Sequence, residues 1–314
     1  MFENIGNLWH RLRGPEQPQH PGAGLFAYTH QDENERSRVH LRLDPDGRGL
    51  LLVNANRVMH LNPSAAFMAY LWLEKIPPAA AQRALSQAYD APPEQLAQDY
   101  AQTVFQLKEL VRPDGACPLH ELELETTLPF SARPSAPYRM DLALTYRCNN
   151  DCPHCYNARA RDFSELDTAA WQRILDRLWE LRIPHVVFTG GEPTLRADLP
   201  ALIAHAQANG QVTGLNTNGR RLRDRAYVQE LVAAGLDHVQ ITLESHDPEV
   251  HDQMVACRGA WLQTVAGIRA ALDSPLFVMT NTTMLRANAP AMVETLDFLA
   301  ELGVPTVGLN ALIY

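Results

Sequence analysis

The chain is poor in cysteine and has no long uninterrupted apolar run. Its 314 residues include only five cysteines. An odd number of cysteines, after a start that does not resemble a signal peptide, argues against a disulfide framework. No stretch of about 18 apolar residues occurs, so no membrane span is expected. Hydrophobic residues still make up 46% of the chain, which is enough for packed cores in about two domains.

Basic residues are also in short supply. The chain has 27 Lys and Arg against 36 Asp and Glu, with a formal net charge of -9. Binding to nucleic acid requires concentrated Lys and Arg to neutralise phosphates. Nucleic acid is therefore not expected as a partner.

Three of the cysteines lie close together. Cys148, Cys152 and Cys155 follow a β-like run at 140–146 with C-x3-C-x2-C spacing. Soft thiolate ligands suit iron-sulfur clusters, and one short loop can wrap around a cubane and bind three of its irons. We therefore predict a 4Fe-4S cluster held by these cysteines, with a fourth iron that has no protein ligand. Because an open metal position can bind a small molecule, the cluster is expected to be catalytic.

Other uses of the cysteines fit the sequence less well. A zinc site would need a second Cys or His pair at regular spacing, and only His154 falls within the loop. Cys117 and Cys257 are distant in sequence and are expected to be thiols without a ligand role. An oxygen-labile cluster with free thiols predicts a reducing compartment, the cytoplasm.

Beyond about residue 138, short β-branched runs alternate with longer helical stretches, which indicates parallel βα units. Strands are predicted at 141–145, 185–189, 211–216, 238–243, 277–282 and 305–309. Helices are predicted at 168–181, 199–209, 224–234, 261–272 and 290–302. The pattern predicts an α/β fold, a partial (β/α)6 barrel, whose functional groups gather at the carboxyl ends of the strands.

The predicted strand ends carry glycine or polar residues. The cysteines follow the first strand, and the next three strands end in Gly190-Gly191-Glu192, Asn216-Thr217 and Thr242-Leu243-Glu244. Together the cysteine triad, the Gly-Gly-Glu-Pro segment at 190–193 and the Thr-Asn-Gly turn at 217–219 resemble the radical S-adenosylmethionine (radical SAM) enzymes. The resemblance extends from about residue 138 to the C-terminus.

This resemblance implies a mechanism and a pair of cofactors. S-adenosylmethionine would bind the open iron of the 4Fe-4S cluster, and an electron from the cluster would cleave it to methionine and a 5'-deoxyadenosyl radical. That radical abstracts a hydrogen atom from the substrate. An electron donor such as flavodoxin or ferredoxin is then expected as a partner.

The resemblance also implies roles for individual residues. Gly190 and Gly191 would bring bare backbone against the methionine moiety, and Glu192 could accept from its ammonium group. His154 takes the position where the family usually has an aromatic residue against the adenine. Contacts to the ribose and the methionine carboxylate are implied for Asn216, Thr217, Thr242 and Glu244. The usual fourth-strand pattern is Ser-Leu-Asp, and Thr-Leu-Glu keeps both functional groups with one extra carbon each.

Residues 25–111 have a different pattern. Strands predicted at 40–43, 49–54 and 57–61 precede helices at 64–73, 77–89 and 93–110, which indicates a small winged-helix-like α+β domain. The segments at 60–66 and 89–94 resemble the PqqD-like peptide-recognition domains, which bind a leader peptide as an added strand at the sheet edge. DNA binding is not expected, because residues 60–110 contain few basic side chains.

These observations predict four parts: a flexible tail at 1–24, the PqqD-like domain at 25–111, a proline-containing linker at 112–137 and the radical SAM barrel at 138–314. Relatives with both domains usually carry a further cysteine-rich extension for auxiliary clusters, and the sequence given has none after the sixth strand.

The predicted function is that of a radical SAM oxidoreductase or maturase that modifies a ribosomally synthesised precursor peptide. Two alternatives remain open. The chain could mature a small cofactor, such as a quinone or a tetrapyrrole, or it could be a non-catalytic module that presents a peptide to another enzyme. Substitution of the three cysteines distinguishes the last alternative from the other two.

Overall fold

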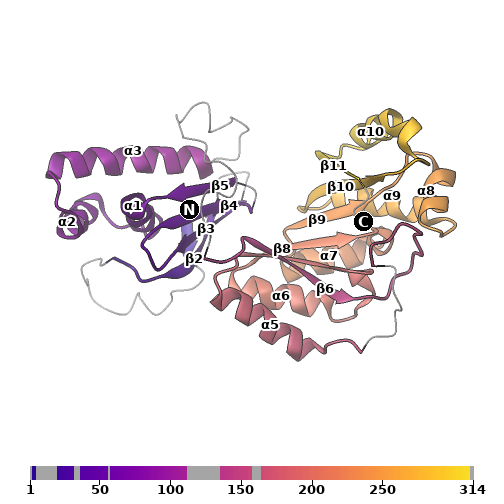
Figure 1. Cartoon of the computed structure of the whole chain (residues 1–314), viewed down its shortest axis with the longest axis horizontal. Helices are drawn as coiled ribbons and strands as arrows, with labels where there is room; N and C mark the ends of the chain where they lie inside the picture. The colour runs from indigo at the N-terminus through magenta and orange to yellow at the C-terminus, as the bar shows by residue number, and fades with distance from the viewer. Residues whose placement is uncertain are drawn as a thin grey trace. The chain divides into compact units, whose positions relative to one another are not determined.

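A computed structural model of the chain describes residues 2–4, 20–31, 36–55, 57–111, 135–157 and 164–311. The chain divides into two compact units (Figure 1): Met1–Tyr138 with Leu178–Pro184, and Arg139–Arg177 with His185–Tyr314. Most of the predicted tail and linker, including Cys117, lies outside the described ranges. None of the helices within these ranges combines the length and the hydropathy that a membrane span requires.

The first unit contains an antiparallel five-stranded sheet in the order β1-β2-β3-β4-β5. Its strands are β1 Phe2–Asn4, β2 Gly24–Gln31, β3 Arg36–Leu43, β4 Gly49–Val53 and β5 Arg57–Leu61. The last three match the predicted strands, although β3 begins earlier than expected. A tight turn joins β3 to β4, with the Gly47 N–H donating to the Asp44 carbonyl at 3.0 Å.

Strands β1 and β2 were not predicted. Residues 2–4 pair with residues 28–30 of β2, so this part of the predicted tail is a strand. The two strands are far apart in the sequence and no short turn signal joins them. Strand formation depends on the neighbours that a segment meets in the sheet, and a local pattern does not reveal such a distant pairing.

Three helices follow the sheet of the first unit: α1 Pro63–Leu73, α2 Pro78–Ala88 and α3 Pro93–Val111. The N-cap of α1 is Asn62, whose Oδ1 accepts from the Ala65 N–H at 2.9 Å. One side of α1 packs on the sheet with the end of α3, while Phe67 and Leu71 form a second core cluster with α2. Because α1 has buried residues on both sides, it is the centre of this unit.

The second unit contains a six-stranded sheet in the order β11-β10-β9-β8-β7-β6, and all neighbouring strands are parallel. The strands are β6 Arg139–Thr145, β7 His185–Gly190, β8 Val212–Thr217, β9 His238–Thr242, β10 Phe277–Met284 and β11 Thr306–Ala311. Each strand lies beside the next one in the chain, so the βα units follow one another without reversal. The prediction of an α/β fold with a parallel, partial (β/α)6 barrel is confirmed.

Helices α5 Thr168–Glu180, α6 Leu199–Asn209, α7 Arg225–Ala234, α8 Pro248–Met254, α9 Ala260–Leu272 and α10 Met292–Glu301 connect these strands. Figure 1 shows them around the outside of the strands. All except α8 were predicted to within two residues at each end. Helix α8 has only 7 residues, too few to show a helical period. Its start is capped by Asp247, whose Oδ1 accepts from the Glu249 N–H at 2.7 Å.

Alternation along β9 distinguishes the two faces of this sheet. Val239 and Ile241 are fully buried, whereas His238, Gln240 and Thr242 are only partly buried. The buried residues face the helix layer, because successive side chains on a strand point to opposite faces. The partly buried face is therefore the interior of the partial barrel.

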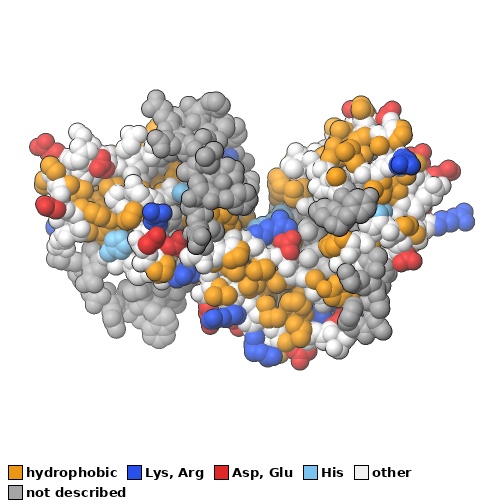
Figure 2. Space-filling view, in the orientation of Figure 1, with side chains coloured by type: hydrophobic (Ala, Val, Ile, Leu, Met, Phe, Trp, Pro, Cys, Tyr) orange, Lys and Arg blue, Asp and Glu red, His pale blue; other side chains and the backbone are white. Residues whose placement is uncertain are grey.

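On the surface seen in Figure 2, the described Lys and Arg side chains are interspersed with Asp and Glu.

Two histidines meet at the opposite ends of the strands from the cysteines. His185 begins β7 and His238 begins β9, and their Nε2 atoms lie 2.8 Å apart. Between them, β8 carries Gly214, where a Cβ atom would lie 2.2 Å from the His238 ring. Burial lowers the pKa of His238 to about 4; Asp237 and Asp141 oppose this shift, and Arg139 adds to it.

Acidification should destabilise the second unit through two histidines. The pKa of His251 is also lowered to about 4, again mainly by burial. An unfolded imidazole has a pKa of about 6.5. Below that pH the unfolded state binds protons that the folded state excludes, so the free energy of unfolding falls until about pH 4. The expected loss is about 3 kcal/mol for each histidine, measurable by urea unfolding at several pH values.

A single substitution tests the His238 part of this effect. His238→Gln keeps a side chain that can hydrogen-bond to His185 and removes one of the two titrations. The decline in stability between about pH 6.5 and about pH 4 should become shallower by about half. An unaltered pH profile would show that His238 is not one of the groups responsible.

Candidate active site

The three cysteines lie in one loop that begins where β6 ends. Cys148, Cys152 and Cys155 are each partly exposed and form no disulfide with any other described cysteine. A turn closes the loop, with the Cys155 N–H donating to the Cys152 carbonyl at 3.1 Å. The Asn150 N–H points to Cys148 Sγ at 3.4 Å. Burial, followed by the charges of Cys148 and Cys155, raises the pKa of Cys152 to about 12.

Segments that follow later strands hold this loop in place. Arg220, after β8, donates from Nη1 to Asn150 Oδ1 at 2.7 Å. Asn218 Nδ2 donates to Asn149 Oδ1 at 2.6 Å. The Val255 carbonyl, at the end of α8, accepts from the loop N–H of residue 151 at 3.0 Å. Asn218 belongs to the Thr-Asn-Gly turn that the sequence analysis noted, although it was not named as a site residue. Arg220 and Val255 were not predicted, because neither stands in a motif with distinctive spacing.

The start of the loop is fixed by an ion pair. Arg147 donates from Nε and Nη2 to the two carboxylate oxygens of Glu165, each at 3.1 Å. Glu165 also accepts from Thr145 Oγ1, and the hydrogen bond from Arg147 is the main reason why the pKa of Glu165 is lowered. The Arg147 side chain is 54% exposed, so the pair orients the loop more than it stabilises the fold.

Gly190 and Gly191 close against the same loop. The Gly191 N–H donates to the Thr145 carbonyl at 2.7 Å, and the Gly190 carbonyl accepts from Asn157 Nδ2 at 2.9 Å. A Cβ atom on Gly190 would lie 2.2 Å from the Thr145 carbonyl oxygen, and one on Gly191 would lie 2.3 Å from that of Arg147. These glycines therefore let the β7 end touch the backbone at the start of the cysteine loop, while the Asn157 side chain reaches β7 from the other end of the loop.

Glu192 is fully buried. Its Oε1 accepts from Thr217 Oγ1 at 2.7 Å and from the hydroxyl of Thr194 at 2.6 Å, while Oε2 accepts from the Asn218 N–H at 2.8 Å. Burial raises the pKa of this carboxyl. The donors from 194, 217 and 218 join the end of β7 to the end of β8. The predicted acceptance of a hydrogen bond from the methionine ammonium stays a prediction.

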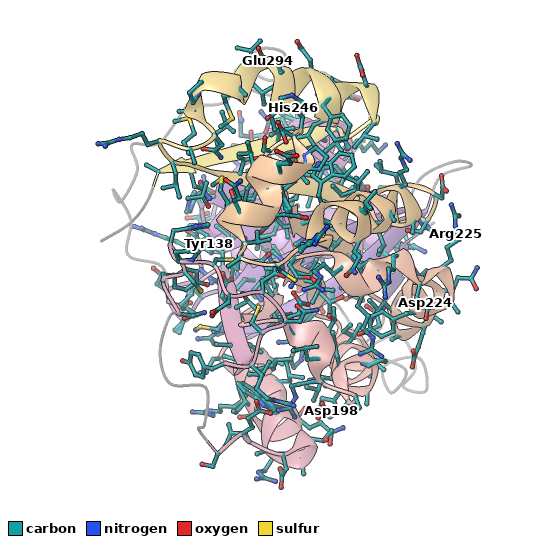
Figure 3. The ribbon with its side chains drawn as sticks, turned by 90° about the vertical axis from the view of Figure 1, so that its right-hand side faces the viewer. Tyr138, Asp198, Asp224, Arg225, His246 and Glu294 are labelled. Carbon is teal, nitrogen blue, oxygen red and sulfur yellow. The ribbon has the colours of Figure 1, made fainter. Side chains whose placement is uncertain are left out.

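Glu192→Gln should lower the free energy of unfolding. The glutamine amide would place an N–H₂ group against either the Asn218 N–H or the two threonine hydroxyls, so buried donors would lose their acceptor. The expected cost is about 1 to 3 kcal/mol, measured by urea unfolding. As a control, Glu294→Gln on α10, whose exposed side chain is labelled in Figure 3, should cost less than about 0.5 kcal/mol. Equal effects in the two variants would contradict the internal role of Glu192.

The remaining predicted residues lie at the ends of β8 and β9. Asn216 is opposite Gln240 in the sheet, and Thr242 is two residues further along β9, so these side chains share the interior face. Asn216 and Thr242 are partly buried. Thr217, by contrast, is buried and donates to Glu192. Gln240 was not predicted, and only the alternation of the strand could have indicated it.

His154 and Glu244 are in direct contact. His154 Nε2 lies 3.1 Å from Glu244 Oε1, and the Glu244 side chain is only 2% exposed. The sequence placed each residue separately at the cofactor and did not predict the contact. In Figure 3 the labelled Asp198, at the start of α6, lies among the first βα units, and the labelled His246, two residues after Glu244, lies beside α10.

The family model of the Radical SAM superfamily matches residues 142–299. This is half of the chain, and it includes the cysteine loop and the ends of β6 to β10. The chain belongs to the radical SAM superfamily, whose cofactors are a 4Fe-4S cluster and S-adenosylmethionine.

Curated relatives match the barrel region. The PqqA peptide cyclase of Xanthomonas campestris pv. campestris (strain B100) is 36% identical over 162 residues, which are 50% of this chain and 43% of that protein. The enzyme of the same name from Methylocella silvestris is 36% identical over 168 residues, or 52% and 44% of the two chains. The matched region thus spans less than half the length of these relatives.

Solved structures resemble the chain over a larger part of its length. Streptococcus suis SuiB bound to S-adenosylmethionine matches with a TM-score of 0.61 and 19% identity, over 88% of this chain and 62% of that one. SuiB bound to the precursor peptide SuiA matches with a TM-score of 0.60 and 18% identity, over 87% and 62%. At this identity the likeness is one of fold.

The donor set in the cysteine loop fits a 4Fe-4S cluster better than a single ion. Within the described residues, no three Cys, His, Asp or Glu side chains converge as ligands of one metal ion. A cubane needs a different arrangement, since each iron takes one thiolate and the cube keeps the sulfurs apart. Three cysteine thiols on one short loop meet that requirement.

Proposed function

We propose that this chain is a radical SAM enzyme that modifies a ribosomally synthesised precursor peptide, and that Cys148, Cys152 and Cys155 bind the cluster. The observation that carries the proposal is the joining of a cysteine-bearing parallel barrel to a small sheet-and-helix unit. The match to SuiB covers 88% of the chain, more than the second unit alone could supply. Together with the name of the PqqA peptide cyclases, this favours a peptide substrate.

Some residues of the second unit bind the cofactors, and others hold the binding residues in position. The three thiols hold the cluster, and Gly190, Gly191 and the interior face with Asn216 and Thr242 border the space left for S-adenosylmethionine. When bound, these cofactors supply a one-electron cleavage that yields methionine and a 5'-deoxyadenosyl radical able to take a hydrogen atom from the substrate. Glu192 and Thr217 keep the β7 and β8 ends together, so this space keeps its shape.

The first unit is proposed to be a PqqD-like recognition domain that binds the leader of the precursor. Among the described strands, β5 lies at one edge of the sheet, and β1 lies at the other edge and pairs with β2. Val58 on β5 is 41% exposed, and Arg57 Nη1 donates to the Leu110 carbonyl of α3 at 2.9 Å. An extended peptide can add to such an edge by backbone pairing. Tethering a leader there raises the local concentration of its core segment at the barrel.

Cleavage of S-adenosylmethionine tests the enzymatic part of this proposal. Anaerobically reconstituted and chemically reduced protein is expected to convert it to methionine and 5'-deoxyadenosine, and to change the mass of a precursor peptide encoded next to the gene. A reduced cluster that leaves S-adenosylmethionine intact would refute it. Flavodoxin or ferredoxin is the proposed physiological donor, and the reducing cytoplasm is the proposed location, since the cluster requires it.

Hydrogen exchange tests the proposed leader site separately. Adding the precursor peptide should slow exchange of β5 backbone amides, because pairing protects an edge strand, and should leave the β2 edge unchanged since β1 already covers it. Protection confined to other strands would place the leader elsewhere.

A further inference from the structure

Glu244 connects the cysteine loop to the far side of the site. Its Oε1 contacts His154 Nε2 at 3.1 Å, and its Oε2 accepts from the Thr283 N–H at 2.8 Å, at the end of β10. Since a carboxylate oxygen can only accept, the hydrogen lies on His154 Nε2, and this residue stands directly before the third cysteine. One buried side chain thus joins the loop after β6 to the strand end of β10.

The backbone of Glu244 is fixed as firmly as its side chain. Its N–H donates to His251 Nδ1 on α8 at 3.1 Å, and its carbonyl accepts from Asn288 Nδ2 at 2.7 Å. The whole residue is 1% exposed. Turning the carboxylate toward a ligand would break its hydrogen bonds to His154 and to the Thr283 N–H, and each break would leave a buried polar group unpaired. The two backbone hydrogen bonds keep the rest of the residue from moving with it.

We propose that Glu244 is a positioning residue, which acts through His154 to fix the cysteine loop, and that His154 serves as its hydrogen-bond donor more than as an aromatic surface for the adenine. This inference rests on the proposed ligand role of the three cysteines. It differs from the roles that the family resemblance implies, in which both residues touch S-adenosylmethionine.

The physical basis is the geometry of the residue next to a ligand. Groups that hydrogen-bond to a metal-binding segment orient its ligands, and their loss typically costs 10-fold to 100-fold in metal affinity. In this chain the hydrogen bond between His154 and Glu244 is buried and involves a carboxylate. Removing the His154 donor therefore also leaves the Glu244 carboxylate without its side-chain partner. Both effects loosen the loop at Cys155.

Two substitutions at one position separate the donor from the ring. His154→Gln keeps an N–H donor that can reach Glu244 and removes the aromatic ring, whereas His154→Phe keeps an aromatic ring and removes the donor. We expect His154→Phe to lose iron to a chelator about 10-fold faster than wild type, and His154→Gln to stay within about 2-fold of it. Iron loss is followed by absorbance, and the affinity for S-adenosylmethionine is measured by equilibrium binding.

The opposite ranking would overturn the proposal: if His154→Phe behaves as wild type, or if both variants lose iron equally, the hydrogen bond to Glu244 does not position the loop. Selective loss of S-adenosylmethionine affinity in His154→Gln would instead show that the ring contacts the adenine.

Glu244→Ala should reproduce the iron loss of His154→Phe. The double variant should lose iron little faster than either single variant, because both substitutions remove the same interaction. Additive losses in the double variant would also overturn the proposal.

A second His-carboxylate pair provides the control. His205 Nε2 lies 2.6 Å from Asp176 Oδ1 between α6 and α5, with side chains 28% and 48% exposed. His205→Phe removes a similar pair away from the cysteine loop and should leave iron retention unchanged. If the reconstituted wild-type protein holds no iron, the proposed function is wrong. If the wild-type protein holds a stable cluster and His154→Phe retains iron equally well, only the positioning role of Glu244 is refuted.

Discussion

Cys148→Ser, Cys152→Ser and Cys155→Ser should each reduce the iron retained after anaerobic reconstitution to less than about a tenth of the wild-type content. A hydroxyl is a far weaker ligand than a thiolate for a cubane iron, and the loop offers no replacement sulfur. Formation of 5'-deoxyadenosine should fall below detection in all three variants. Iron and sulfide assays measure the first effect, and chromatography of the products measures the second.

Cys257→Ser is the matched control for these variants. Cys257 is a free, partly exposed thiol that follows α8, and α8 ends on the Val255 carbonyl that accepts from the cysteine loop. It is thus a nearby cysteine in the same unit without a proposed ligand role. The variant should retain full iron and activity. Loss of iron in Cys257→Ser, with retention in any one triad variant, would show that the ligand set has been assigned wrongly.

Gly191→Ala should have the second largest effect. The added Cβ atom would lie 2.3 Å from the Arg147 carbonyl oxygen and 2.7 Å from that of Tyr146, distances that real contacts do not reach. Backbone must therefore move on one side or the other, at the point where β7 meets the start of the cysteine loop. We expect the free energy of unfolding to fall by about 3 kcal/mol, together with poorer retention of iron.

Gly303→Ala separates this packing effect from backbone strain. Gly303 has φ of +84° and no atom within 4 Å of the position of its Cβ, so alanine there should cost only about 1 kcal/mol for the left-handed conformation. Iron retention should not change. Urea unfolding measures the stability of both variants. If Gly191→Ala is as stable as Gly303→Ala or more stable, the close packing of Gly191 against the start of the cysteine loop is not important for stability.

The positions of the barrel strands along the chain could be predicted because each element carries a local signal. Runs such as Val186 to Phe188 are short and apolar, and polar or glycine residues follow them, as Gly190 follows β7 and Asn216 ends the apolar run of β8. Helix α6 was predicted with its observed limits, since Leu199 begins an apolar period and Gly210 ends it. Helix α8 was missed because its N-cap, Asp247, is too weak a signal without a repeating pattern of apolar residues. Strand β1 was missed because its partner is distant in the chain.

The candidate site was predictable as a set of segments but not as a set of contacts. Sequence motifs named the segments at the ends of β6, β7, β8 and β9, which the fold brings to one end of the sheet. They could not show that Glu192 would be enclosed by internal donors or that Glu244 would meet His154, 90 residues away. Which polar groups satisfy one another depends on the packed structure, because a buried carboxylate takes whichever donors lie within reach.

Electron paramagnetic resonance of the reduced, reconstituted protein, recorded with and without S-adenosylmethionine, tests the central claim most directly. Three thiolates on one loop leave one iron of the cube open, so the signal of a reduced 4Fe-4S cluster should change when S-adenosylmethionine is added. A signal that does not respond, or a protein that binds zinc in place of the cluster, would contradict the claim.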